Sequence, residues 1–221
     1  MGAASVAVVT EGDLGILANV TGRPRLAEVD RRRHVIAAAA DLFLHRGYHA
    51  TTMDDVARAA GMSKKTVYQL FSSKSELFEG LLSDSFAPFT APIEVDDRPL
   101  REVLTEALAR LAHLALSERQ VLLMRLLIAE TSCSEEIATA VDRQCIGQGR
   151  GALQRWLAAQ AARGTLAVDD AREAANTLFY SAVGEFLMRL LLWKRERPTP
   201  QEIDSRVAYT VDAFFRQVAA R

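Results

Sequence analysis

The chain has few residues of the kinds on which disulfide scaffolds, metal centres and β-rich folds depend. Cysteine occurs only as Cys133 and Cys145 among 221 residues, without the spacing of a metal site or a secreted disulfide framework. Glycine and proline number only 12 and 6, and no run alternates β-branched with polar residues. Hydrophobic residues, mainly Ala and Leu, make up 49% of the chain. The composition therefore predicts an all-α protein, and the cysteine usage fits the cytoplasm.

Signals for export, membrane insertion and catalysis are also missing. The first twenty residues have no basic region before their apolar residues. Glu11 and Asp13 interrupt the apolar run, which is too short for a membrane span. Glycine-rich phosphate loops, His-Glu-x-x-His pairs and nucleophile elbows do not occur. His45 and His49 are four residues apart, but Gly47 should end a helix between them. We therefore expect no catalytic residue, no metal site, no cofactor and no membrane partner.

Positive charge is distributed unevenly along the chain. The formal net charge is -1, whereas nucleic-acid-binding domains usually carry a basic excess. Between Asp30 and Gly80, however, eight Lys or Arg face six Asp or Glu. Residues 31–33 are three arginines at the head of a helix predicted from Asp30 to Arg46, where they oppose the helix dipole unless an anion such as a DNA phosphate is near. The positive charge is small but lies in one segment.

That segment contains the pattern of two short helices joined by a tight turn. Thr52 is a suitable N-cap, and apolar residues follow it at helical spacing. Gly61 can end this helix in a left-handed conformation, and Ser63 can cap a second helix that Val67 anchors inward. A turn of about three residues is typical of a helix-turn-helix. Residues 51–74 are therefore interpreted as one.

The second of these helices presents side chains suited to base edges and phosphates. The residues of this helix that are predicted to bind DNA are Lys64, Lys65, Thr66, Tyr68 and Gln69, and Lys74 follows just beyond it. Two alternatives stay open at this point: an ordinary solvated helical hairpin, or a helical module that binds protein. DNA binding through the lysines would weaken steeply with salt, which distinguishes the alternatives.

The motifs of this N-terminal segment resemble those of a known protein family. The helix ending at Gly47 and the sequences TTMDDVARAAGMSKKTVYQLF and SSKSELF resemble the DNA-binding domain of the TetR family of transcriptional regulators. Two later segments, RLLIAETS and AAQAARGTLAVDDAREAA, are similar to the C-terminal domain of its AefR-like subset. The resemblance implies a homodimeric repressor that binds a palindromic double-stranded DNA operator and responds to an unknown small-molecule inducer. It also implies that Thr52 lies at a backbone phosphate and that Ser63 joins the residues of the second helix near bases or phosphates. Lys65 stands where many relatives have a small residue, so the base preference cannot be transferred.

The sequence suggests three parts with different roles. Residues 1–28 lack periodicity and are expected to form a flexible arm, whose Arg23 and Arg25 either enter a minor groove or belong to an unstructured tail. Residues 29–75 should form the three-helix DNA-binding domain. Residues 76–221 should form an antiparallel helical bundle for ligand binding and dimerisation, in which a helix predicted over 135–163 contains three glycines.

Two sets of apolar residues mark the predicted sites of the C-terminal part. An excess of large apolar groups on the last two helices predicts a dimer interface at Phe179, Val183, Leu187, Leu190, Val207, Val211, Phe214 and Phe215. Candidates for an apolar ligand pocket are Phe86, Phe89, Leu108, Met124, Ile128, Trp156, Phe179, Phe186 and Met188. A redox switch through Cys133 and Cys145 is an alternative, although one continuous helix would hold them about 18 Å apart.

Overall fold

The computed structural model describes residues 25–94, 97–132, 134–142, 151–192 and 196–219 of the chain. Within these ranges the protein is helical and contains no strand. The helices are α1 (Arg25–Arg46), α2 (Met53–Ala59), α3 (Lys64–Leu70), α4 (Lys74–Thr90), α5 (Leu100–Ala115), α6 (Glu118–Thr131), α7 (Glu135–Val141), α8 (Gly151–Ala162), α9 (Ala171–Leu192) and α10 (Pro200–Ala219). None of them is long and apolar enough to cross a membrane. The predicted all-α class is confirmed.

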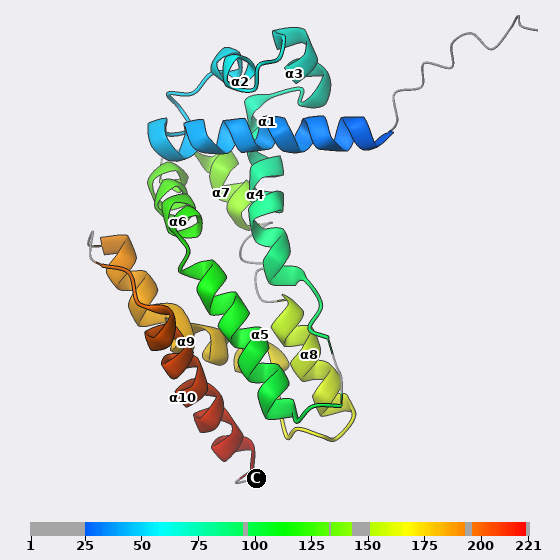
Figure 1. The fold of residues 1–221 in the computed structure, drawn as a ribbon, viewed down its shortest axis with the longest axis vertical. Coiled ribbons are helices and arrows are strands. Elements are labelled where there is room, and N and C mark those ends of the chain that lie inside the picture. The colour runs from blue at the N-terminus through cyan, green and yellow to red at the C-terminus, as the bar shows by residue number, and fades with distance from the viewer. Residues whose placement is uncertain (1–24, 95–96, 133, 143–150, 193–195, 220–221) are drawn as a thin grey trace, which may run out of the picture.

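Local sequence signals account for the three N-terminal helices. Thr52 caps α2 through its side chain, while the Asp55 carboxylate accepts a hydrogen bond from the Thr52 backbone N–H at 3.1 Å, which completes a capping box. Ser63 caps α3, and Gly61 supplies the left-handed turn between the two helices with φ +62°. Val67 and Phe71 are fully buried against α1 and its neighbours. The predicted helix-turn-helix is therefore present, at one end of the molecule (Figure 1).

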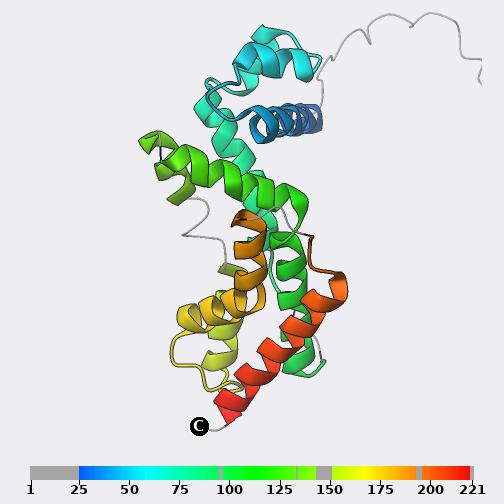
Figure 2. The same cartoon turned by 90° about the vertical axis from the view of Figure 1, so that its left-hand side faces the viewer.

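Helix α4 connects this unit to the rest of the chain. Ser73 caps it, and its first half packs on α1. It also packs on α7 and α8, and Pro88 lies in its last turns. Because Pro lacks an N–H, those turns lose one intrahelical hydrogen bond. Figure 2 shows α4 running from the helix-turn-helix end into the C-terminal body.

The C-terminal body is a bundle whose helices pack side by side. Helix α5 packs on α9 and α10, α8 packs on α9, and α9 packs on α10. Helix α6 lies between the bundle and the DNA-binding end, where it contacts both α9 and α1 (Figure 2). Fully buried leucines such as Leu104, Leu108 and Leu153 fill the interior. The predicted fold, a three-helix unit followed by a C-terminal helical bundle, is thus confirmed, whereas the domain boundaries stay a prediction.

Some predicted boundaries differ from the observed ones. Helix α1 begins at Arg25 rather than Asp30, so residues 31–33 lie more than a turn inside the helix and do not face its positive end. Within the predicted helix over 135–163, the structure describes α7 and α8, and residues 143–150 between them lie outside the described residues. Cys133, Cys145, Gly147, Gly149 and the arm residues 1–24 lie outside the described residues. The redox hypothesis and the role of the arm therefore stay untested.

Candidate nucleic-acid interface

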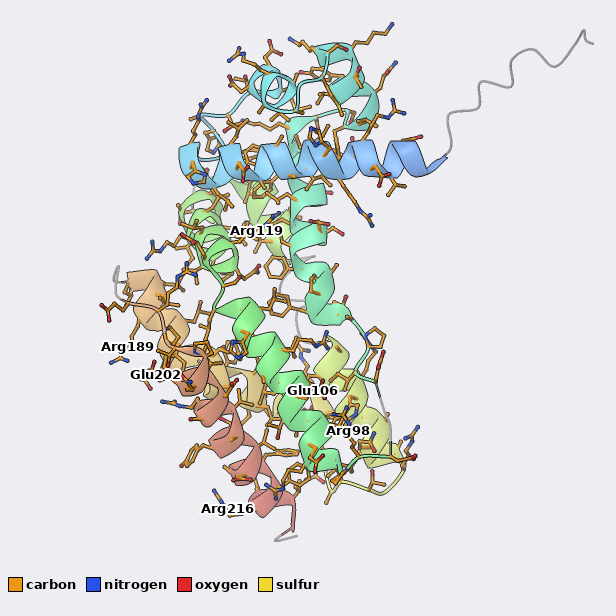
Figure 3. All side chains as sticks on the ribbon, in the orientation of Figure 1. Arg98, Glu106, Arg119, Arg189, Glu202 and Arg216 are labelled. Atoms are coloured by element: carbon orange, nitrogen blue, oxygen red, sulfur yellow. The ribbon has the colours of Figure 1, made fainter. Side chains whose placement is uncertain are left out.

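Helix α3 presents its polar residues outward on a rigid base. Val67 is fully buried and Leu70 nearly so, which fixes the helix from below. The exposed side chains are those of Ser63, Lys64, Lys65, Tyr68 and Gln69, and the exposed fraction of Tyr68 is 43%. Thr66 is half-buried, with its hydroxyl 2.8 Å from that of Ser63, and Thr52 is exposed at the start of α2. These seven predicted residues belong to α3 and to the caps of α2 and α3, and the α2–α3 unit lies at the end of the molecule farthest from the C-terminal bundle (Figure 3).

The Lys64 ammonium is held in place before any DNA arrives. Its Nζ lies 2.8 Å from one carboxylate oxygen of Asp54 and 3.1 Å from the other. The hydrogen bond to Asp54 raises the pKa of Lys64 above its ordinary value. Lys64 is therefore fully protonated at neutral pH and links the N-terminal ends of α2 and α3. A phosphate that binds Lys64 would compete with Asp54 for it.

Lys74 differs from the other predicted DNA-binding residues because it is partly used inside the protein. Its half-buried ammonium donates to the carbonyl oxygens of Tyr48 at 2.9 Å and Thr51 at 3.0 Å. It also lies 4.3 Å from the centre of the Tyr48 ring. The geometry gives Lys74 a structural role, in which it fixes the loop before α2, that the sequence pattern did not reveal.

Arg32 is a second basic residue whose role was missed. Its guanidinium donates to the Leu70 carbonyl at the end of α3 and stacks 4.1 Å from the centre of the Phe71 ring. The Glu76 carboxylate lies 3.7 Å away. Hydrogen bonds from Ser72, and secondarily the charge of Arg32, lower the pKa of Glu76. Arg32 therefore connects α1, α3 and α4, a function that needs no DNA phosphate.

Glu130 of α6 joins the C-terminal body directly to the DNA-binding domain. Its Oε1 accepts a hydrogen bond from the Tyr48 backbone N–H at 2.9 Å, and its Oε2 lies 3.2 Å from His49 Nε2. The carboxylate also packs against Gly47, where a Cβ would come within 3.3 Å of it. Gly47 has φ +87°, a conformation that favours glycine. A movement of α6 would therefore be transmitted to the loop that precedes α2.

We expect replacement of Glu130 with alanine to loosen this connection. The partly buried Tyr48 N–H would lose its acceptor, which typically lowers the free energy of unfolding by about 1–3 kcal/mol. Glu130→Gln keeps an acceptor for Tyr48 and should lose less. Urea unfolding of both variants measures the difference, with the exposed Asp84→Ala on α4 as the control for a lost carboxylate. Equal stability of Glu130→Ala and Asp84→Ala would show that the contact contributes nothing.

The predicted dimer residues separate into two groups. Val183, Leu190, Val207 and Val211 are buried within the single chain, because α5, α9 and α10 pack over them. Phe179, Leu187, Phe214 and Phe215 are half-buried. Large apolar residues that the sequence analysis did not select are exposed on the same two helices, namely Tyr180, Leu192 and Tyr209, together with Met188, which it had placed in the pocket. A groove between α9 and α10 is lined by Thr177, Ser181, Tyr209 and Ala213 among others.

The predicted ligand residues are only partly brought together. Phe86 and Phe89 of α4 lie with ring centres 5.9 Å apart, and Phe179 of α9 meets Phe89 edge to face at 6.3 Å. Leu108 and Trp156 are buried in the same core, and Met124 is half-buried against it. Phe186 lies under the Arg206 guanidinium instead, and Ile128 and Met188 are 54% and 55% exposed. The aromatic cluster of Phe86, Phe89 and Phe179 is therefore the part that forms a unit.

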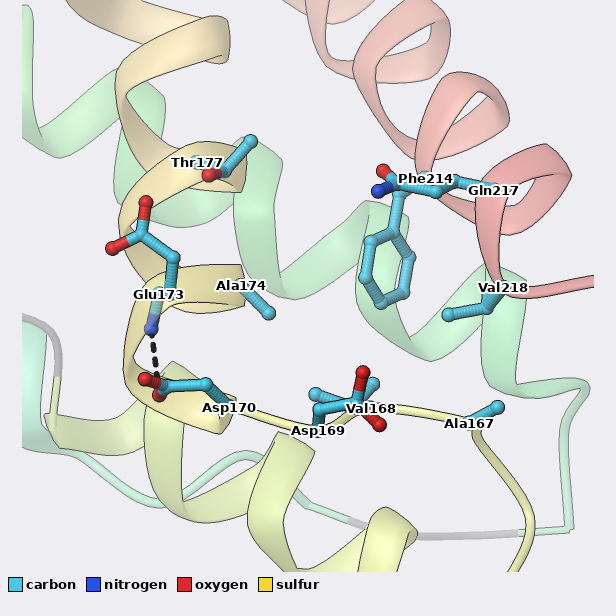
Figure 4. Close-up of a pocket in the computed structure, with 10 residues that line it drawn as sticks. All are labelled: Ala167, Val168, Asp169, Asp170, Glu173, Ala174, Thr177, Phe214, Gln217 and Val218. Atoms are coloured by element: carbon cyan, nitrogen blue, oxygen red, sulfur yellow. Dashed lines mark hydrogen bonds between the residues drawn. The ribbon is translucent and has the colours of Figure 1, made fainter. Parts of the chain in front are cut away.

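An open groove at the far end of the bundle contains none of these residues. It has a volume of about 250 Å³ and lies between the start of α9 and the end of α10 (Figure 4). Asp170 in its wall already caps α9, because its Oδ1 accepts hydrogen bonds from the backbone N–H groups of Arg172 and Glu173. In the part of the chain that the structure describes, no three His, Cys, Asp or Glu residues gather as a metal site. The geometry thus favours the α2–α3 surface as the functional site.

Comparisons with known proteins agree with this geometry. The family model for bacterial regulatory proteins of the tetR family matches residues 35–81, and that for the C-terminal domain of AefR-like transcriptional repressors matches residues 102–219. The transcriptional activator FasR of Mycolicibacterium smegmatis is 48% identical over 58 residues, which cover 26% of each protein. The chain therefore spans about a quarter of that relative's length.

Two solved structures extend the similarity to most of the chain. A TetR-family regulator from Mesorhizobium loti has a TM-score of 0.76 at 23% identity, covering 86% of this chain and 97% of its own. The flavonoid-responsive regulator FrrA has a TM-score of 0.70 at 27% identity, with the same coverage. The first similarity shows the fold alone. Together with the two family models, these matches cover both the helix-turn-helix and the bundle.

Proposed function

Because this chain belongs to the TetR family of transcriptional regulators, we propose that it is a homodimeric repressor whose two α3 helices bind a palindromic DNA operator. The observation that carries the proposal is the surface of α3, where Lys64, Lys65, Tyr68 and Gln69 project from a helix anchored by buried Val67. The N-terminal residues of such a helix reach base edges in the major groove, and hydroxyls and lysines around it contact phosphates. Double-stranded DNA is the partner that this surface fits best.

Dimerisation is supported by the apolar face of α9 and α10. Tyr180, Met188 and Tyr209 expose more than half of their surfaces on helices that otherwise pack closely. Half-buried Phe179, Leu187, Phe214 and Phe215 adjoin them. A two-fold axis through this face would allow two copies of α3 to enter successive major grooves, which are about 34 Å apart along the duplex. We therefore propose this face as the subunit interface.

The C-terminal domain is proposed to bind an inducer that releases the DNA. Support for repression comes from the match to the AefR-like repressor domain, whereas FasR is named an activator over a much shorter match. FrrA responds to flavonoids, which suggests an amphipathic aromatic inducer here. Residues 29–75 would then be the DNA-binding domain and 76–221 the ligand-binding and dimerisation domain of a cytoplasmic regulator. Helix α4, which spans both, would transmit the change.

Titration of the protein against its own upstream DNA at two salt concentrations tests this function. Six to ten phosphate contacts per dimer should lower the affinity about 1,000-fold or more between about 50 and 200 mM salt. A scrambled duplex of the same length should bind far more weakly at the higher concentration. A protein-binding module would show neither effect. Absence of specific binding to any upstream segment at low salt would refute the proposal.

A further inference from the structure

Two buried side chains of α8 have hydrogen-bonding groups that no other described residue satisfies. Trp156 is 4% exposed and Gln160 is 1% exposed, and neither the indole Nε1 nor the amide Nε2 has a partner. The residues are four apart on one helix, so their side chains lie on the same face. Buried polar groups are nearly always hydrogen-bonded, because leaving them unpaired in the folded state is costly. Two such groups one turn apart indicate a site with a missing partner.

The orientation of the Gln160 amide does not remove this deficit. The Thr165 hydroxyl lies 2.9 Å from both the backbone carbonyl and the side-chain Oε1 of Gln160, but it has only one hydrogen to donate. Exchanging the two ends of the amide would let Nε2 donate to Thr165 and would leave Oε1 unpaired instead. One end of the amide is therefore free in either orientation. The Trp156 indole is a donor only, so its partner must be an acceptor.

The helices that pack on α8 carry aromatic residues and no buried ionisable side chain. Helix α8 packs on α9 and α4, and Arg155 Nη2 donates to the Thr90 carbonyl at the end of α4 at 2.7 Å. These neighbours carry the aromatic cluster of Phe86, Phe89 and Phe179 and a third unsatisfied group, Ser85 Oγ. Among the described residues, the buried polar side chains are those of Thr51, Gln120, Gln160 and Thr210, none of which ionises. A charged ligand would thus find no buried counter-charge on α4, α8 or α9; the buried, unpaired Nε of Arg125 lies on α6.

We propose that α4, α8 and α9 enclose the binding site of an uncharged, largely apolar aromatic molecule whose carbonyl oxygen accepts a hydrogen bond from the Trp156 indole. The Gln160 amide makes a second polar contact with the same molecule, and the aromatic cluster packs against its rings. This site specifies the ligand of the proposed regulator. Only the identification of the bound molecule as an inducer rests on the proposed function. Entry displaces the last turns of α4, which Pro88 has already deprived of one hydrogen bond. Because α4 continues into the DNA-binding domain, occupation of the site alters the position of α3.

The test measures ligand binding to the full chain without DNA. Flavone, an uncharged aromatic ketone, and flavan, which has the same rings without the carbonyl, are titrated by calorimetry into the wild type, Trp156→Phe and Gln160→Met. Phenylalanine keeps an aromatic ring but no N–H, and methionine keeps the length of glutamine without its amide. We expect the wild type to bind flavone more tightly than flavan, and Trp156→Phe to lose about tenfold in flavone affinity while its flavan affinity is unchanged.

Thermal unfolding without ligand separates this role from a structural one. Each substitution removes an unpaired group, and in Gln160→Met the Thr165 hydroxyl keeps the Gln160 backbone carbonyl as its acceptor, so both variants should unfold at the same temperature as the wild type or higher. Failure of flavone to bind the wild type, equal flavone affinity for the wild type and Trp156→Phe, or a clear fall in the unfolding temperature of both variants would overturn the proposal. A failure of the proposed function would appear separately, as absent operator binding in the DNA titration, and would leave the calorimetric result unaffected.

Discussion

Replacing Lys64 and Lys65 together with alanine is expected to weaken operator binding by about 100-fold or more at about 0.1 M salt. Both side chains are exposed at the start of α3, and a dimer would present four of them to the duplex. Losing four positive contacts should also reduce the slope of log affinity against log salt by about 3 to 4. Fluorescence anisotropy with a labelled operator at several salt concentrations measures both effects.

A matched control removes equal charge from elsewhere on the protein. Arg110 of α5 and Arg119 of α6 are exposed and lie in the C-terminal part, so Arg110→Ala with Arg119→Ala should leave operator affinity within a few-fold of the wild type. The lysine variant should keep its helical content, because neither lysine is part of the core. If both double variants weaken operator binding equally and reduce its salt dependence equally, the loss would reflect the total charge of the protein. A specific contact of α3 with DNA would then be excluded.

The second large effect is expected from Met188→Glu on α9. Met188 is 55% exposed, and helical spacing places it on the same face as Ser181 in the α9–α10 groove. A carboxylate there costs the single chain little, but burying it unpaired at a subunit interface should dissociate the dimer. Because a single short recognition helix binds DNA weakly, operator affinity should fall by about 1,000-fold. Analytical ultracentrifugation and DNA titration together measure the two losses.

Ile128→Glu is the appropriate comparison for this variant. Ile128 has nearly the same exposure, 54%, but lies on α6, outside the proposed interface. It should remain dimeric with unchanged operator affinity, and both variants should keep the helical content of the wild type. A Met188→Glu protein that sediments as a dimer and binds the operator normally would remove the α9–α10 face from consideration as the interface.

The two ends of the molecule are connected by a small number of identifiable contacts. Helix α4 carries the aromatic rings of the proposed ligand site near its end and is capped beside α3 at its start. Glu130 of α6 provides a second connection through the Tyr48 N–H and His49. Displacement of either helix would therefore change the orientation of α3 relative to the two-fold axis. Two subunits whose α3 spacing no longer matches successive major grooves would release a palindromic operator.

The sequence by itself determined the features that depend on nearby residues. Thr52, Ser63 and Ser73 cap helices through hydrogen bonds that span three residues, and Gly61 is required where the backbone turns left-handed. Such interactions can be recognised from spacing alone, because both partners lie within one turn. The helix-turn-helix, the outward-facing side chains of α3 and the all-α class were therefore predictable. The resemblance to the TetR family rests on these same local motifs.

Tertiary structure alone decided which residues meet across long stretches of chain. Glu130 reaches a backbone N–H 82 residues away, and Lys74 supports the loop before α2, but no periodicity marks either contact. Helical spacing identifies an apolar face without saying what covers it. Thus Val183, Val207 and Val211 of the predicted interface are buried within one chain, while Tyr180 and Tyr209 are exposed. The unpaired groups of Trp156 and Gln160 likewise depend on the tertiary structure, because they can be recognised only from the positions of the described residues around them.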